Sequence, residues 1–282
     1  MMNILFMRHG GSEQLHRYWR NGARLPSLQA WWERFHTTLV PNKGNESFNK
    51  SVHVKEMDGG RSYGIVFDDR LSLKTPAKKP FVVPSKYLAH GIAAEWMWQR
   101  GNRVDPETMP LMSLAATAID EPQSRDVIAT SLCSFLPTDP VLCRDDDSSK
   151  VDLSVRQASI HDPYIVYVNN LLGTRLRPST SIVGAAISVR DAGLVKEYIL
   201  GLDSWQRSAL MDLSSACKSL CMAIGGVEGE FTGDDLIQAS RIEEEYQIQQ
   251  WGLVEGGHDI DLVDIKVRIH SPLVFLNLLY MK

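Results

Sequence analysis

The pattern of apolar and polar residues divides the chain into a front part with a period of two and a back part with the period of a helix. From Ser51 to Leu73, short runs with alternating apolar residues are separated by Asp-Gly-Gly and Asp-Asp turns, which is typical of strands joined in hairpins. From residue 86 onward, apolar residues recur mainly at intervals of three and four, as on one face of a helix. The sequence therefore predicts an α+β protein with a small antiparallel β domain followed by a larger all-helical domain.

The changes of period also suggest domain boundaries. We expect a targeting segment and linker over residues 1–50, an N-terminal β domain with its adjoining helix over residues 51–105, and a C-terminal helical domain over residues 106–282. Residues 261–270 alternate apolar and polar side chains, so this stretch predicts a closing strand, followed by an apolar helix from Pro272 to Leu279.

The helix expected over residues 86–100 joins the two parts of the chain. Ser85 is a good N-cap, and at 100° per residue an apolar face forms from Leu88, Ala89, Ile92, Ala93 and Trp96. We therefore interpret Trp96 as a structural core residue. Glu95 and Trp98 point away from that face and are candidates for contact with a partner. The alternative is that a neighbouring loop half covers Trp98, since Trp is highly buried on average.

Capping signals divide the back part into further helices. Asp162-Pro163 predicts a helix start and Gly173 its end. The capping box Asp203 to Gln206 predicts a long helix reaching Ile224, and that of Thr232 to Asp235 predicts a last long helix ended by Gly252. Cys217 and Cys221 lie four apart on the first of these. Without further ligands at suitable spacing, they are interpreted as core thiols.

The end of the last long helix carries the main candidates for binding. Glu244 shares a helix face with Ile237, Ile248 and Trp251. If buried, its carboxylate needs a partner; if exposed, it borders an apolar patch of the kind that receives another protein. The alternative is a Glu at the helix edge that reaches water. Acidic groups beside a Trp suit the rim of a protein contact. The partner-binding residues expected are Glu244, Trp251, Glu255, His258, Asp259, Glu95 and Trp98.

Composition narrows the classes of function. The net charge is −4 and the pI about 6.1, so no general basic field favours nucleic acid. No apolar run approaches the roughly 18 residues of a membrane span. The phosphate-binding loop, the dinucleotide loop and the nucleophile elbow are all missing from the sequence, so we expect no nucleotide, cofactor or resident metal. Four cysteines without metal-site or secreted-disulfide spacing indicate a reducing compartment.

One enzymatic alternative remains open. Glu255, His258 and Asp259 are the residue types that supply general acid and base groups or ligands for a divalent metal, so the alternative function is a metal-dependent hydrolase. The glycines at 256 and 257 argue against it, because ligands on a flexible turn lack the supporting shell that fixes them.

Residues 1–44 differ from the remainder. They are basic and rich in aromatic residues, with Glu13 and Glu33 as their only acids. Amphipathic segments of this composition are typical of mitochondrial presequences, which are removed rather than folded. The alternative is an N-terminal helix docked on the body through Trp31, Trp32 and Phe35.

Taken in order, many short motifs resemble the ATP12 family, assembly chaperones for the α subunit of F1-ATPase. The resemblance covers roughly residues 52–265, and the number and order of its motifs make it specific. One position departs from the family: Met97 stands directly after the Glu95-Trp96 pair, where members commonly have an acidic residue. The matching positions are Leu73-Lys-Thr-Pro76, Pro84, Leu88-Ala89, Ile92-Ala93, Glu95-Trp96, Gln99, Met109-Pro110-Leu111, Thr117 to Asp120, Asp139, Leu142-Cys143-Arg144, Gln157, Asp162-Pro163, Glu243 to Gln247, Trp251-Gly252, Val254-Glu255 and His258-Asp259.

The resemblance implies a non-catalytic factor of the mitochondrial matrix. Such a factor binds the free F1 α subunit, prevents its aggregation, and hands it over when the α/β hexamer forms. The resemblance also implies that the protein is not an enzyme and binds neither nucleic acids nor nucleotides.

Overall fold

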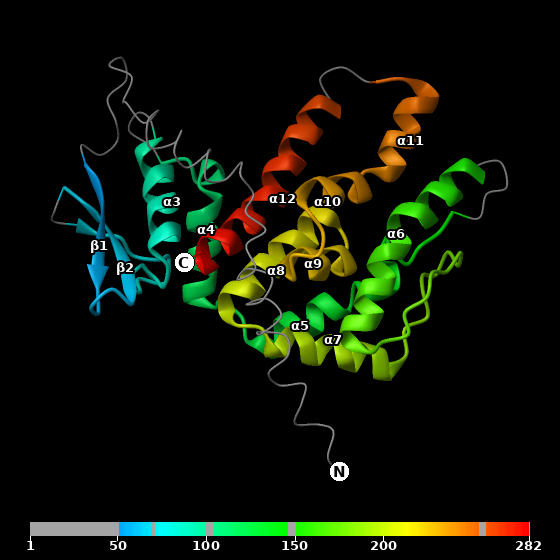
Figure 1. The fold of residues 1–282 in the computed structure, drawn as a ribbon, viewed down its shortest axis with the longest axis horizontal. Helices are drawn as coiled ribbons and strands as arrows, with labels where there is room; N and C mark the ends of the chain where they lie inside the picture. Colours follow the sequence, from blue (N-terminus) through cyan, green and yellow to red (C-terminus); the bar gives the residue numbers. More distant parts are fainter. Residues whose placement is uncertain (1–50, 69–70, 100–103, 146–150, 254–257, 282) are drawn as a thin grey trace, which may run out of the picture. The chain divides into compact units, whose positions relative to one another are not determined.

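The computed structural model describes residues 51–68, 71–99, 104–145, 151–253 and 258–281 (Figure 1). The expected targeting segment, with Trp31, Trp32 and Phe35, lies outside them. Within the described residues the chain forms a small sheet followed by helices, so the predicted α+β class is confirmed.

A four-stranded antiparallel sheet forms the front of the chain. β2 (Ser62–Phe67) pairs with β1 (Val52–Met57), β3 (Leu71–Ser72) and β4 (Val82–Val83). Asp58, Gly59 and Gly60 all have positive φ in the β1–β2 turn, which explains the Asp-Gly-Gly sequence because glycine adopts such φ values without steric cost.

Helix α3 (Lys86–Met97) packs against β1 and β2. It begins where Ser85 accepts a hydrogen bond from the Leu88 amide, while the Ser85 hydroxyl donates to the Leu278 carbonyl at 2.5 Å. The ring of Trp96 is buried and meets Phe67 edge-on, with centroids 4.9 Å apart.

Two compact units are present. Unit 1 holds the described residues up to Leu73, together with Val82–Met109 and the residues from Leu278 onward; unit 2 holds Lys74–Phe81 and Pro110–Asn277. The domain boundaries drawn from the sequence stay a prediction.

Unit 2 is built from helices around a buried pair, α8 (Ser204–Cys217) and α9 (Leu220–Val227). All residues of α9 are buried, as expected for a helix that is apolar on every side. The short η1 (Pro106–Thr108) belongs to unit 1. The other elements that follow it are α4 (Pro110–Asp120), α5 (Arg125–Cys133), η2 (Leu136–Thr138), α6 (Val151–Leu172), α7 (Val189–Gly201), α10 (Gly233–Ser240), α11 (Ile242–Trp251) and α12 (His258–Tyr280). None of the helices described has the length and apolar character needed to cross a membrane.

The predicted closing strand is wrong. Residues 261–270 belong to α12, which continues without interruption through Pro272. Ile269, Pro272 and Phe275 are buried at helical spacing, whereas the alternating residues Val263 and Val267 are exposed. The alternation therefore came from valines on the outer face of a helix and not from a strand.

Three predicted helix limits also differ from the structure. α6 begins at Val151 and passes through Pro163, so Asp162 is not its cap. The long helix expected from Asp203 ends at Cys217, because Lys218 after it has a left-handed φ of 55°, and Ser219 then caps α9. The last long helix is interrupted at Arg241, between α10 and α11. Gly173 and Gly252 do follow helix ends, both with positive φ.

Candidate partner-binding surface

Helix α11 is fixed on α6 by side-chain hydrogen bonds near both of its ends. Gln157 donates to the Glu243 carboxylate at 3.0 Å, and Arg156 donates to Gln249 at 2.6 Å. The same Gln157 accepts from the Asp145 amide at 3.0 Å. Since these bonds link three segments distant in sequence, α11 has a defined position on unit 2.

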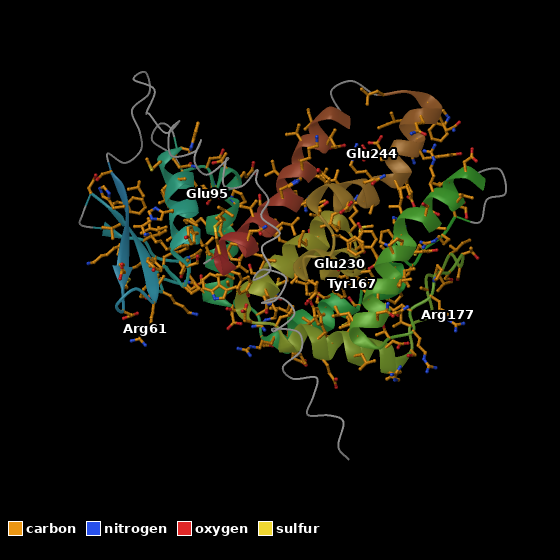
Figure 2. All side chains as sticks on the ribbon, viewed as in Figure 1. Arg61, Glu95, Tyr167, Arg177, Glu230 and Glu244 are labelled. Atoms are coloured by element: carbon orange, nitrogen blue, oxygen red, sulfur yellow. The ribbon has the colours of Figure 1, made fainter. Side chains whose placement is uncertain are left out.

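Glu244 forms an ion pair with a buried arginine. The Arg241 guanidinium is buried at the α10–α11 junction and donates to Glu244 at 2.6 Å, with Glu245 at 3.6 Å (Figure 2 labels Glu244). An unpaired buried guanidinium is costly. Glu244 therefore pairs with a buried cation, and it stabilises the junction in addition to any contact with a partner protein.

His161 connects α6 to the end of α10 in its neutral form. Its Nε2 lies 3.0 Å from the Ala239 carbonyl, and its Nδ1 lies 3.5 Å from a guanidinium nitrogen of Arg144. Because arginine only donates, Nδ1 accepts and Nε2 carries the proton. Burial lowers the pKa of His161, and the cation of Arg144 adds to this, while the Ala239 carbonyl and Asp162 oppose it.

This arrangement predicts a loss of stability in mild acid. Because the pKa of His161 is lower in the folded than in the unfolded chain, its contribution is complete above the unfolded value of about 6.5 and is lost as the pH falls through the folded value. The His161→Gln variant retains a donor for Ala239 and an acceptor for Arg144. We expect its melting temperature to fall less than that of the wild type between pH 7.5 and 5.

The control for this measurement is the exposed His53 of β1. The His53→Gln variant should reproduce the wild-type pH dependence. A His161→Gln variant with an unchanged pH profile would contradict the assignment of the neutral ring.

An apolar stripe on the outer turns of α12 is the main feature that sequence reasoning missed. Ile260, Val263 and Val267 are exposed, and their spacing places them on one face of the helix. Trp251, 76% exposed, ends α11, and Leu253 follows it. The helical spacing was visible in the sequence but was interpreted there as part of a strand.

The ends of α11 and α12 extend on the same side of unit 2 (Figure 1). Acidic residues accompany the stripe: Asp261 and Asp264 are exposed on α12, and Glu245 is half exposed on α11. Arg268 lies 3.6 Å from Asp264 and donates to Ser215 of α8, which links α12 to α8 at the surface. We call Trp251, Leu253, Ile260, Val263 and Val267, with these acids, the acidic surface.

The remaining predicted residues are distributed over the chain. Glu255 lies outside the described residues. His258 and Asp259 are the first residues of α12, but their side chains lie outside what the structure describes. Glu95 and Trp98 belong to unit 1, where Glu95 is half-buried on α3 and Trp98 is 53% exposed just after it (Figure 2 labels Glu95). The structure thus places Glu244 and Trp251 together on α11, and leaves the grouping of the others as a prediction.

No group of three or more His, Cys, Asp or Glu side chains suited to a metal ion occurs among the described residues. The expectation of two core thiols is confirmed, because Cys217 and Cys221 are buried and free. Burial raises the pKa of Cys217 to about 12, so this thiol is not a reactive nucleophile at neutral pH.

Comparisons with known proteins agree with this architecture. Residues 46–169 match the family model described as ATP12 chaperone protein. The mitochondrial protein atp12 of Schizosaccharomyces pombe is 27% identical over 245 residues, with 83% of each chain covered. The mitochondrial protein ATP12 of Saccharomyces cerevisiae is 23% identical over 278 residues, covering 83% of this chain and 84% of the relative.

A solved structure extends the likeness beyond the family model. The crystal structure of Atp12 from Paracoccus denitrificans has a TM-score of 0.72 and 27% identity, and the match covers 83% of this chain and 98% of that one. Proteins of this family are chaperones rather than enzymes, which disfavours the hydrolase alternative. By the family-model match over residues 46–169 and the likeness to these relatives and to the solved Atp12 structure, the chain is similar to the ATP12 family of F1-ATPase assembly chaperones.

Proposed function

We propose that this protein binds the free α subunit of F1-ATPase in the mitochondrial matrix and prevents its aggregation until the α/β hexamer forms. We refer to the α subunit below as the client. The observation that supports this most strongly is the acidic surface, where five large apolar side chains are exposed at the end of α11, just after it and on the outer turns of α12. Soluble monomeric proteins rarely expose contiguous apolar patches unless these bind a partner.

The chemistry of such a client fits this surface. Subunit interfaces of permanent assemblies are large and apolar, so a free subunit exposes surface that aggregates. A chaperone that covers it needs apolar side chains for contact and charged groups at the rim for orientation. The stripe on α12 supplies the first, while Glu245, Asp261 and Asp264 supply the second.

The proposed location rests on two observations of different kinds. The two yeast relatives are named as mitochondrial proteins. Residues 1–44 also have the basic, acid-poor composition of a presequence. Import of a fusion of residues 1–50 to a reporter protein into isolated mitochondria, with protection from added protease, tests this proposal.

The direct test is co-purification with separately expressed F1 subunits. We expect the α subunit to be retained and the β subunit not. The Val263→Asp variant places a charge in the apolar stripe at an exposed position, so it should weaken binding of the α subunit about tenfold or more, since hot-spot losses commonly exceed 1.4 kcal/mol. Its melting temperature should stay close to that of the wild type.

Val166→Asp is the matched control, because Val166 is exposed to a similar extent on α6. It should bind the α subunit as the wild type does. Equal binding by Val263→Asp would remove the α12 stripe from the contact surface. Retention of the β subunit alone would overturn the choice of client.

A metal measurement addresses the hydrolase alternative. Purified protein with one tightly bound divalent ion per chain, and a hydrolytic activity lost with chelator and with Asp259→Asn, would support the enzyme. Metal-free protein that retains the α subunit is the result we expect.

A further inference from the structure

The three most exposed large apolar side chains of the described residues lie close together in sequence, away from the acidic surface. Ile182 is fully exposed, Val183 is 91% exposed and Val189 is 92% exposed. They belong to the connection between α6 and α7 and to the first residue of α7. We call residues 173–190 the ridge. In Figure 1 this connection runs outward from the end of α6 and returns to α7.

The tip of the ridge is held in one conformation. The backbone of Ser179 pairs with Leu142 and Arg144, at 2.8 and 2.9 Å. Gly184 has a φ of +106°, and a Cβ there would collide with the Pro137 carbonyl, which also accepts from the Ala185 amide at 2.7 Å. Only glycine fits this position, so the sequence fixes how Ile182 and Val183 are presented.

The base of the ridge is fixed as well. Asn169 of α6 accepts from the Leu176 amide at 2.8 Å and donates to the Leu176 carbonyl at 3.0 Å. The buried Asp191 accepts from the Arg175 amide at 3.0 Å and from the Ser188 hydroxyl at 2.6 Å. The segment that leaves α6 and the segment that enters α7 are therefore both ordered. A partner would bind the ridge without the entropy cost of ordering a loop.

The ridge is basic, in contrast to the acidic surface. Residues 173–190 contain Arg175, Arg177 and Arg190 and no Asp or Glu. All three arginines are exposed, and only Arg190 lies near a carboxylate, that of Asp191 at 3.7 Å, among the ion pairs of the described residues (Figure 2 labels Arg177). A cationic, apolar surface fits an acidic and apolar segment of a partner.

The ridge and α11 are both attached to α6. Arg144, which pairs with Ser179 of the ridge, forms an ion pair with Asp162 of α6 at 2.6 Å. On α11, Gln249 accepts from Arg156 of α6 at 2.6 Å. The ridge and α11, which carries Trp251 of the acidic surface, are therefore both attached to α6.

We propose that the ridge is a second contact surface for the client, in which Ile182 and Val183 enter an acidic and apolar segment while the acidic surface meets a basic one. This inference rests on the proposed function. Opposite charges at the two contacts fix the orientation of the client, since the reversed orientation places like charges together.

A protein partner explains the ridge better than a lipid surface. Ile182 and Val183 together offer seven side-chain carbons, about half those of one myristoyl chain, which by itself binds membranes only marginally. Phe, Tyr and Trp, the anchors enriched at membrane interfaces, do not occur between residues 173 and 190.

The test is the affinity for purified F1 α subunit, measured with the full chain at low and high salt. Replacing Ile182 and Val183 by Ser together should weaken binding about tenfold, and Arg177→Glu should weaken it at low salt with a smaller effect at high salt. The control replaces the exposed Val127 and Val166 by Ser, and it should bind within about twofold of the wild type. A photoreactive residue at position 182 should crosslink to an acidic segment of the α subunit.

The outcomes separate the two proposals. A wild type that does not bind the α subunit overturns the proposed function, and this inference with it. Wild-type binding that the ridge variants retain, without crosslinking from position 182, overturns the ridge alone. Ridge variants that keep the α subunit but lose binding to vesicles of phosphatidylglycerol and phosphatidylcholine would instead identify a lipid surface and overturn the inference as well.

Discussion

Replacing Trp96 by Arg should destabilise unit 1 by about 3 to 5 kcal/mol, the cost of removing a large aromatic side chain from a packed core, and burying the guanidinium adds to that cost. Trp96 is 7% exposed on α3, and its ring meets Phe67 of β2 edge-on. The sheet and α3 pack on each other across this contact. A loss of this size approaches the whole stability margin of a typical domain, so we expect aggregation or a strongly reduced melting temperature.

Trp98→Arg provides a matched control in the same segment. It makes the same chemical change two residues further on, where the side chain is 53% exposed. Substitutions at such positions usually change stability by less than about 0.5 kcal/mol. Soluble Trp96→Arg protein that melts like the Trp98→Arg variant would show that Trp96 does not hold α3 on the sheet.

The fold class and α3 followed from local patterns. The alternation around Val54 and Ile65 gave the hairpin, and these two residues are paired in the sheet. The Ser85 cap and the spacing of Leu88 and Ile92 gave the buried face of α3. Such signals can be read from sequence because cap, period and burial all indicate the same element.

Helix limits in unit 2 were harder to predict because tertiary contacts override local rules. Pro163 lies inside α6, although an internal proline costs roughly 3 kcal/mol in a helix. Asp162, expected as a cap, instead pairs with Arg144, while the buried His161 and Gln157 place the preceding turns against other segments. Local sequence contains the proline but not the contacts that compensate for it.

The candidate site was predicted in part for a related reason. In the sequence, Glu244 and Trp251 were notable because a carboxylate and an aromatic residue share one otherwise apolar helix face. The structure places both on α11. The α12 stripe and the ridge did not stand out, because exposed valines and isoleucines look like core residues in a sequence. Only the structure shows that Ile182, Val183 and Val263 are exposed within the part of the chain that it describes.

The motifs that carried the family resemblance turn out to include much of the buried polar network. Gln157 links α6, α11 and the Asp145 backbone, and Arg144 holds Asp162 and contacts His161. Asp139 is the most buried carboxylate of this group, at 1% exposed. It ends η2 and reaches the first turn of α9 from a distant part of the chain. These positions hold segments of unit 2 together and are not part of the proposed contact surfaces.

Asp139 acts as an N-cap supplied by another segment. One carboxylate oxygen accepts from the Val141 amide at 3.0 Å, and the other accepts from the Leu220 and Cys221 amides at 2.8 and 3.0 Å. Burial raises the pKa of the Asp139 carboxyl, while hydrogen bonds from Ser219 and the amides oppose this shift. The negative charge also interacts favourably with the positive end of α9.

Asp139→Asn should therefore cost about 2 to 4 kcal/mol, although it hardly changes the shape of the side chain. An amide group has one acceptor oxygen, so its NH₂ must face backbone N–H groups that then remain unsatisfied, at about 1 to 3 kcal/mol each. Chemical denaturation measures the loss. Asp126→Asn is the control, because Asp126 is exposed and pairs with Lys196 at the surface, where such pairs contribute about 1 kcal/mol or less. Equal stability of the two variants would mean that the start of α9 is held by packing alone; a larger loss for Asp139→Asn would show that one buried carboxylate joins η2 to the central helix of unit 2.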